Sequence, residues 1–221
     1  MLKQTRIKCF LLGLIVSQFG WAEEFCATTS QGLQNALDQA RSNGQDDVIR
    51  VAAGTYYGPG STFGGYFFNA SEEHHLTITG GFYDFFGNPC GISFNNPLDT
   101  VIDGNSSMRS MYIRLEPNSN LTVTNLSFAN GFATSGAGLT VGRDADTNIT
   151  GEVMINRVGF FNNQANTIAA LYVDDGAVIR VQNSLFYGNH HASNRSIVRL
   201  RNQAQGVYFI NNTVADNLLI G

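Results

Sequence analysis

Positive charge is the scarcest feature of this sequence of 221 residues. It carries 13 Lys and Arg against 17 Asp and Glu, and its only lysines, Lys3 and Lys8, lie with Arg6 near the N-terminus. Removing these three leaves only arginines as cations and a net charge of about −7. Nucleic acids and anionic membranes bind clustered basic residues, so neither is an expected partner.

Long apolar runs are also lacking, apart from one near the N-terminus. CFLLGLIVSQFGWA, at residues 9–22, follows the basic residues just named and ends with the small residues Gly20 and Ala22. This pattern predicts a secretory signal peptide over residues 1–22, and the run is too short to serve as a membrane anchor. We therefore expect a secreted or cell-surface protein without a transmembrane segment.

Cysteine is sparse as well, with three residues in the sequence. Cys9 lies in the predicted signal peptide, which leaves Cys26 and Cys90 in the mature chain. In the oxidising environment of an exported protein, an even number of cysteines indicates a disulfide. We predict a Cys26–Cys90 bond, and two unpaired buried thiols are the alternative.

Helical periodicity is confined to one stretch, TSQGLQNALDQARSNGQ, which begins at Thr29. Ser30 is a candidate N-cap, and Gly44 follows the last periodic residue. The apolar face consists of Leu33, Ala36, Leu37 and Ala40. The first rung of a stacked β structure needs a cover for its open strand edge, so we predict that residues 30–42 form a capping helix.

The rest of the chain consists of short apolar strands separated by Gly, Asn, Asp and Ser, and part of it repeats. LTVTNLSFANG, VMINRVGFFNN, VIRVQNSLFYGN and VYFINNTVADN share one pattern. Each has an alternating strand, one polar residue, a bulky apolar residue, and then Asn or Gly. The polar residues are Asn125, Arg157, Asn183 and Asn211. Each copy follows a second short strand.

These units are too small to bury an apolar face alone. Stacking the copies strand upon strand, about 4.8 Å apart, buries the apolar faces together. Asn at the bends suits a coil because it tolerates left-handed backbone geometry. The repeat therefore predicts an all-β parallel β-helix, or solenoid, with a short N-terminal capping α-helix.

The early segment FCATTSQGLQNALDQARSNGQDDVIRVAAGTYYG, followed by LTITGGF and TVIDGN, resembles secreted bacterial right-handed parallel β-helix proteins of the pectin-lyase-like superfamily. The resemblance implies a right-handed solenoid, with a cap and irregular first coils over residues 23–97 and regular coils over 98–221. Characterised members are mostly polysaccharide lyases and hydrolases, while many others are surface proteins. A fold alone does not decide between these functions.

The resemblance also implies that ligands lie along the outer face of one stacked sheet. Alternation of side chains points two rows of residues outward on the repeated second strand. The first row is Arg114, Thr140, Tyr172 and Arg199, and the second is Glu116, Gly142, Asp174 and Arg201. We take Arg114, Tyr172, Arg199 and Arg201 as candidate sugar-binding residues. The alternative is a solvated face on which charges pair, such as Asp174 with Arg201.

A metal or catalytic site would need acidic residues on neighbouring coils. Asp144, Asp146, Asp174 and Asp175 form a candidate oxygen cluster for Ca²⁺; otherwise no cofactor is expected. Arginine is a poor base because its pKa exceeds 12, and the mature chain has no lysine, so the catalytic residues are unknown. We therefore predict a secreted surface protein that binds extracellular polysaccharide or glycan or acts in adhesion. The alternative is a polysaccharide lyase or glycoside hydrolase.

Two further stretches of the sequence allow structural predictions. GGFYDFFG, at residues 80–87, is the richest aromatic stretch; we interpret it as packing for the N-terminal cap, with a ligand platform as the alternative. GVYFINNTVADNLLIG, at residues 206–221, reads as a last coil with no capping segment after it. Open strand edges pair readily with other chains. We therefore expect a truncated β-helix that self-associates through this coil.

Overall fold

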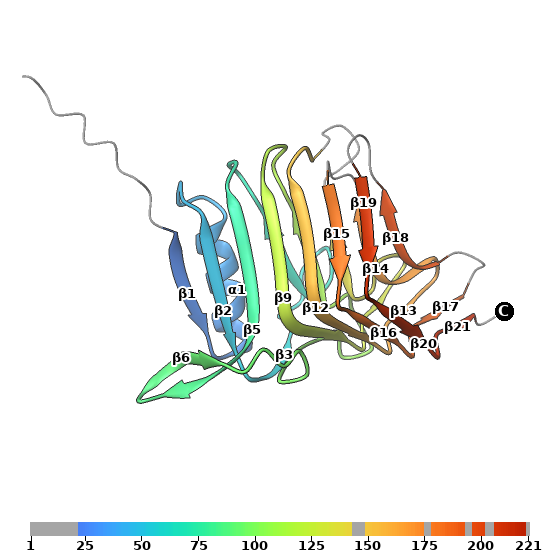
Figure 1. The fold of residues 1–221 in the computed structure, drawn as a ribbon, viewed down its shortest axis with the longest axis horizontal. Coiled ribbons are helices and arrows are strands. Elements are labelled where there is room, and N and C mark those ends of the chain that lie inside the picture. Colours follow the sequence, from blue (N-terminus) through green and yellow to red (C-terminus); the bar gives the residue numbers. More distant parts are fainter. Residues whose placement is uncertain (1–21, 143–148, 175–177, 193–195, 202–205, 220–221) are drawn as a thin grey trace, which may run out of the picture.

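The computed structural model describes residues 22–142, 149–174, 178–192, 196–201 and 206–219. They form a parallel β-solenoid of about 6 turns with one short helix at its N-terminal end (Figure 1), so the predicted β-helix with a capping helix is confirmed. In this described part, no helix combines the length and hydrophobicity that crossing a bilayer requires.

The solenoid has a broad front sheet that bends into a second face. The front strands stack in the order β1 (Glu23–Ala27), β2 (Asp47–Ala52), β5 (His75–Phe85), β9 (Asn120–Ala129), β12 (Glu152–Phe161), β15 (Val178–Gln182) and β19 (Gly206–Ile210). The second face stacks β3 (Gly54–Tyr57), β7 (Thr100–Asp103), the final residues of β9 and β12, β16 (Leu185–Tyr187) and β20 (Thr213–Ala215).

Two further sheets complete the coils, the narrow one only from β10 (Phe132–Ala133) onward. The narrow sheet contains β10, β13 (Gln164–Ala165), β17 (His190–His191) and β21 (Leu218–Leu219). The other, which we call the rear sheet, has the order β4 (Tyr66–Asn69), β8 (Met111–Arg114), β11 (Leu139–Val141), β14 (Ile168–Asp174) and β18 (Ser196–Arg201). All neighbours in these two sheets are parallel.

The bend between the front sheet and the second face uses the repeated polar residue. Asn125, Arg157, Asn183 and Asn211 all have left-handed backbones with φ between 52° and 56°. Their side chains bond along the axis: Asn211 Nδ2 donates to Asn183 Oδ1 at 2.7 Å, and Arg157 Nε donates to Asn125 Oδ1 at 2.9 Å. The sequence repeat therefore marks the place where each coil turns.

The interior consists of stacked rows of like side chains. Phe128, Phe160 and Phe186 are fully buried, with ring centroids 5.5 and 4.7 Å apart. Next to them, the buried amides of Asn163 and Asn189 bond to each other and to backbone carbonyls of neighbouring strands. These rows join the apolar residues of the other sheets in one core cluster.

The helix α1 (Ser30–Ala40) covers the first rung. Leu33, Ala36, Leu37 and Ala40 are its buried residues, as predicted. The N-cap is Thr29 rather than Ser30, because the Thr29 hydroxyl accepts a hydrogen bond from Gly32 N at 3.0 Å. The Ser30 hydroxyl accepts instead from Tyr57 N at 3.0 Å and so ties the helix to β3.

Cys26 and Cys90 form the predicted disulfide, with their Cα atoms 5.8 Å apart. The bond joins β1 to β6 (Asn88–Ser93), which pairs antiparallel with β5 in a hairpin outside the solenoid. Figure 1 shows this hairpin projecting from one edge of the coils. The aromatic stretch at 80–87 runs into that hairpin, so most of it does not pack in the cap as we expected. Phe85 is 51% exposed and Phe86 is 93% exposed.

Candidate functional site

The outer face of the rear sheet is the candidate site. Side chains alternate along β8 as predicted: Met111 and Ile113 are fully buried, whereas Tyr112 and Arg114 are partly exposed. On the next strands the inward residues Leu139, Val141, Leu171 and Val173 are fully buried. The outward Tyr172 is partly exposed, but the outward Thr140 is buried as well, at 6% exposed. The face predicted from the sequence therefore exists.

The predicted rows need a correction on their first strand. Thr140 lies beside Tyr112 and Tyr172, and Tyr172 lies beside Arg199. Tyr112, not Arg114, therefore belongs to the first row. Arg114 lies two residues further along β8 and joins the second row, in the place predicted for Glu116. The error arose because MYIRLE contains three outward positions and the sequence alone did not indicate which of them faces Thr140.

Three aromatic rings gather at the N-terminal end of this face. Phe63 and Phe67 stack with centroids 4.6 Å apart, and Tyr112 lies 5.5 Å from Phe63 and 5.8 Å from Phe67. Phe67 precedes Tyr112 in the first row, because β4 pairs with β8. All three rings are half-buried, so they present an apolar surface to solvent.

Two arginines border these rings. The Arg114 guanidinium carbon lies 4.2 Å from the Phe63 ring centroid and 5.2 Å from that of Tyr112, within cation–π range. Arg109 lies 5.1 Å from the Tyr112 centroid and donates to the carbonyls of Phe63 and Gly136. Burial lowers the pKa of Arg109. Arg109 thus fixes the loop that carries Phe63, while Arg114 covers the rings.

The C-terminal end of the face is more polar. The Arg199 guanidinium carbon lies 5.8 Å from the Tyr172 ring centroid. Arg201 Nη1 donates to Asp174 Oδ1 at 2.8 Å, the ion pair considered from the sequence. The Tyr172 hydroxyl interacts with both members of that pair, and desolvation by burial is the main cause of its raised pKa. Exposed pairs of this kind stabilise a fold by about 0–1 kcal/mol, so the pair mainly orients its side chains.

The predicted calcium cluster can be placed only in part. Asp144, Asp146 and Asp175 lie outside the described residues, and Asp174 is the member of the cluster whose contacts are known. Within the described ranges, no group of three or more His, Cys, Asp or Glu side chains is arranged to hold a metal ion.

Sequence reasoning missed Phe63, Phe67 and Arg109. The available signal was the strand YFFN at residues 66–69, whose alternation matches MYIR and places Phe67 beside Tyr112. Arg109 had no such signal. It packs closely over Gly64, where an added Cβ would lie 2.7 Å from the Arg109 Cβ.

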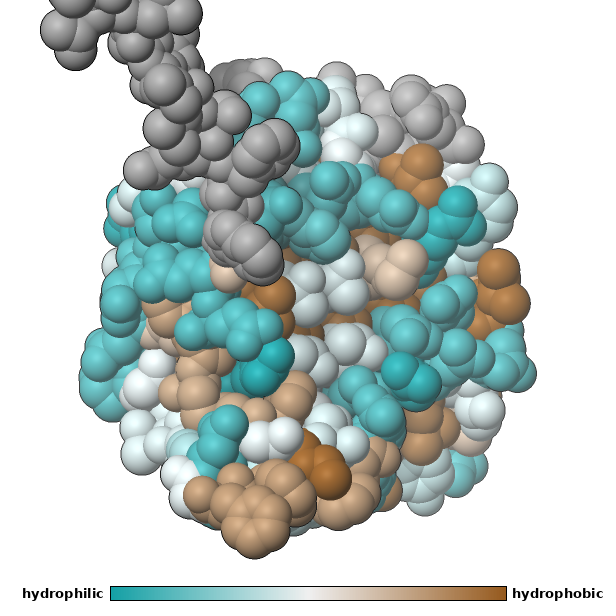
Figure 2. Space-filling model, turned by 60° about the vertical axis from the view of Figure 1, so that its left-hand side comes forward, coloured by the Kyte–Doolittle hydropathy of each residue, from teal (hydrophilic) through white to brown (hydrophobic). Residues whose placement is uncertain are grey.

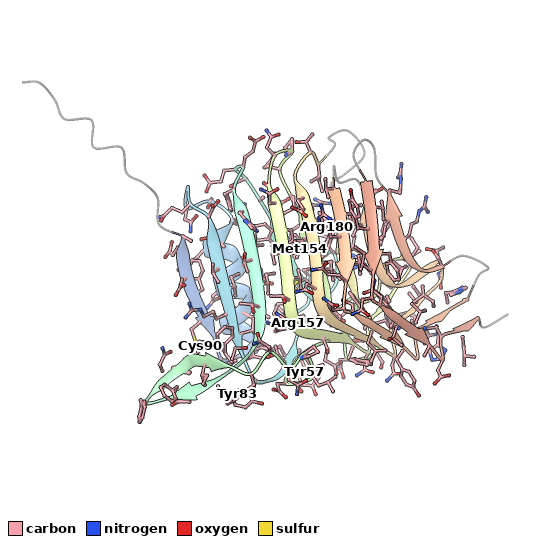
Figure 3. All side chains as sticks on the ribbon, in the orientation of Figure 1. Tyr57, Tyr83, Cys90, Met154, Arg157 and Arg180 are labelled. Carbon is pink, nitrogen blue, oxygen red and sulfur yellow. A yellow bond between two sulfur atoms is a disulfide. The ribbon has the colours of Figure 1, made fainter. Side chains whose placement is uncertain are left out.

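A hollow lies on the front sheet, with a volume of about 190 Å³. It is lined by His75, Asn120, Leu121, Thr122, Glu152 and Met154. Arg180 donates to Glu152 at 2.7 Å and lies 4.2 Å from the Tyr208 ring. Figure 3 shows Met154 and Arg180 on the adjacent strands β12 and β15. The lining of this hollow contains no Phe, Tyr or Trp, whereas the rear sheet presents a cluster of rings, so the rear sheet is the stronger candidate.

No family model, curated protein or solved structure gives a significant match to this chain. The solenoid fold therefore rests on the strand pairing itself, and any function must be argued from the site.

Proposed function

We propose that this protein is exported and binds carbohydrate through the outer face of the rear sheet. The observation that carries the proposal is the cluster of Phe63, Phe67 and Tyr112 beside Arg114, continued along the coils by Tyr172 and Arg199. Export is supported by the Cys26–Cys90 disulfide, since such bonds persist in oxidising compartments.

The chemistry of the face suits a sugar chain. Sugar rings present apolar C–H faces that pack on aromatic rings, and hydroxyl or carboxylate groups that accept hydrogen bonds from arginine. Tyr112 and Tyr172 stand in one row with one strand between them, about 10 Å apart at the usual strand spacing. Two platforms at that separation hold an extended oligosaccharide rather than a single sugar.

The test is a glycan array probed with the protein without residues 1–22, followed by calorimetry with the best ligand. Tyr172→Ala should weaken retention at least tenfold, and Tyr172→Ala combined with Arg199→Ala should abolish it. Tyr187→Ala is the matched control, because Tyr187 is an exposed ring (46%) on β16 of the second face. Retention that persists in the double variant would place the site elsewhere.

The same samples test the alternative that the protein is a polysaccharide lyase or glycoside hydrolase. Release of unsaturated or reducing ends from a bound polysaccharide would add catalysis to binding. Binding without any product would support an adhesive or surface role.

A further inference from the structure

The β5–β6 hairpin is a projection with aromatic side chains at its end. Four exposed rings lie along it, with Phe85 (51%) and Phe86 (93%) at the tip and Tyr83 (37%) and Phe94 (65%) nearer the base. Phe85 contacts Phe86 at 4.5 Å between centroids, and Tyr83 contacts Phe94 at 5.3 Å. Figure 2 shows apolar side chains gathered at the lower end of the molecule, where this hairpin lies.

The turn at the tip places a phenylalanine in a left-handed backbone conformation, which a bulky side chain disfavours. Phe86 and Gly87 form a two-residue turn between Phe85 and Asn88, and both have positive φ, 53° and 83°. Hairpin turns with two positive φ values favour Asn-Gly, and a bulky residue there is strained. Packing does not explain the ring, because it is almost fully exposed. A role at the surface does.

The hairpin is braced along β6. The disulfide holds β6 to β1, and Cys90 itself is buried. Both residues are labelled in Figure 3: Tyr83 pairs with Ile92 near the solenoid, and Cys90 lies in β6 between that pair and the turn. At the tip, Gly87 N donates to Asp84 Oδ1 at 2.9 Å. The rings therefore project from a fixed support.

The charge of the hairpin indicates which partners it can bind. Residues 82–99 contain no Lys or Arg, and their acids are Asp84 and Asp99. Asp84 accepts the bond from Gly87, and Asp99 accepts from Asn96 Nδ2 at 2.7 Å and interacts with the Tyr83 hydroxyl. Both carboxylates stay charged although they accept hydrogen bonds, and residues 82–99 contain no cation that could attract an anionic partner. A surface without net negative charge is therefore the better complement.

The exposed aromatic area distinguishes between a protein partner and a lipid surface. At about 150–250 Å² for each aromatic side chain, the four rings offer roughly 500 Å². A stable protein–protein interface takes about 800 Å² from each partner, with its anchors in pockets. A lipid interface needs no pocket, accepts aromatic rings at the headgroup level, and binds reversibly through small apolar insertions.

We propose that the β5–β6 hairpin inserts its aromatic tip, Phe85 and Phe86, into the interface of a zwitterionic phospholipid bilayer. The backbone of the hairpin suits this role, because β5 and β6 pair with each other and the turn is closed by Asp84. The outer edge of β6 has no partner among the described strands, so the insertion stays in the hydrated interface, where only the two side chains need to reach apolar depth. The inserted hairpin would hold the solenoid at the membrane surface.

Flotation with phosphatidylcholine vesicles tests the proposal. The mature protein should float with the vesicles, and raising the salt concentration should not release it. Phe85→Ser and Phe86→Asn should each reduce the ratio of bound to free protein about tenfold, since a buried phenylalanine contributes about that factor. The double variant should remain in the unbound fraction.

Three controls keep the outcome unambiguous. Phe86→Asn restores the preferred Asn-Gly turn, so its unfolding midpoint should equal or exceed that of the parent, and lost binding cannot be ascribed to misfolding. Tyr187→Ser removes an exposed ring on β16 and should float normally. Tyr172→Ala should float normally too, which separates this proposal from carbohydrate binding.

Several outcomes would overturn the inference. A parent protein that stays in the unbound fraction does so, as does a double variant that floats like the parent. Flotation that requires anionic lipid would show that attraction of charges, not aromatic insertion, drives binding. Hairpin-dependent capture of a protein without flotation would assign the tip to a protein partner instead.

Discussion

Asn163 is a fully buried polar residue of the core, and replacing it tests how the coils are held together. The side chain is fully buried and makes three hydrogen bonds. Gly131 N donates to Asn163 Oδ1 at 2.9 Å; Asn163 Nδ2 donates to the Phe128 carbonyl at 3.0 Å and to Asn189 Oδ1 at 2.9 Å. Asn163→Ala removes all three bonds.

The magnitude follows from the groups left behind. The Gly131 N–H and the Phe128 carbonyl both lose this partner in the interior, and a buried polar group without a partner costs about 1–3 kcal/mol. Asn189 Oδ1 keeps the bond from Asn163 N at 3.0 Å and adds little. We expect Asn163→Ala to lower the free energy of unfolding by roughly 3–5 kcal/mol. The unfolding midpoint should fall by about 10 °C, given about 2–4 °C for each kcal/mol in a chain of this size.

Asn183→Gly is the matched control. The side chain of Asn183 also bonds to asparagines of neighbouring coils, Asn156 and Asn211, but Asn183 is exposed. Its φ of 52° suits glycine, so the change removes only solvated hydrogen bonds and should cost less than about 1 kcal/mol. Urea titration followed by far-ultraviolet circular dichroism measures both. Equal losses of unfolding free energy in the two variants would refute the idea that the bonded amides of Asn163 and Asn189 stabilise the coils because they are buried.

Four other predictions concern the core, the disulfide, calcium and the last coil. Leu171→Ala should cost about 2–5 kcal/mol because Leu171 is fully buried, while Tyr172→Ala on the outer face should cost much less; the same titration compares them. Thiol titration of the unfolded, unreduced mature protein should find no free thiol. Adding calcium or a chelator should leave the unfolding midpoint unchanged, because Arg201 already neutralises Asp174; a calcium-dependent rise that Asp174→Asn abolishes would instead establish the predicted metal site. Light scattering should show self-association of the 221-residue chain that Phe209→Ser weakens, since Phe209 is 44% exposed at an inward position of the last described coil.

The features that follow from stacking could be predicted from the sequence. A residue that faces the interior meets the equivalent residue of the next coil, so the same kind of side chain recurs at each level. Phe128, Phe160 and Phe186 recur for this reason, and so do the left-handed bend residues. The inward column of the rear sheet and the capping helix follow from the same reasoning. The two mature cysteines could be paired because no other partner was available.

The outer surfaces could be predicted only in part. An outward side chain is not constrained by the coil above it, so alternation identifies its face but not its neighbours. That is why Tyr172 and Arg199 were assigned to one row correctly, whereas Arg114 was placed one outward position away from its true row. Phe63 belongs to a loop, so periodicity could not place it on the face at all.

The aromatic hairpin was misread for a related reason. In composition, an aromatic run resembles buried packing, and only the antiparallel pairing of β5 with β6 takes these residues out of the solenoid. The local signal lay in the turn rather than in the rings. Phe86-Gly87 occupies a two-residue connection between paired positions, as an Asn-Gly turn would.

Departures from the repeat therefore say more about function than the repeat does. Stacking explains why equivalent buried positions of successive coils carry the same kind of residue. A different residue there would leave a cavity or an unpaired polar group. At the bends, Arg157 replaces asparagine and accepts a strained backbone, and its Nε takes over the amide's bond to Asn125. Phe86 accepts the same strain at the hairpin tip, where its ring contacts Phe85 but has no equivalent residue on a neighbouring coil that the structure describes. A residue that is strained and almost fully exposed adds little to the stability of the fold, so the hairpin tip is a candidate contact surface in addition to the rear sheet.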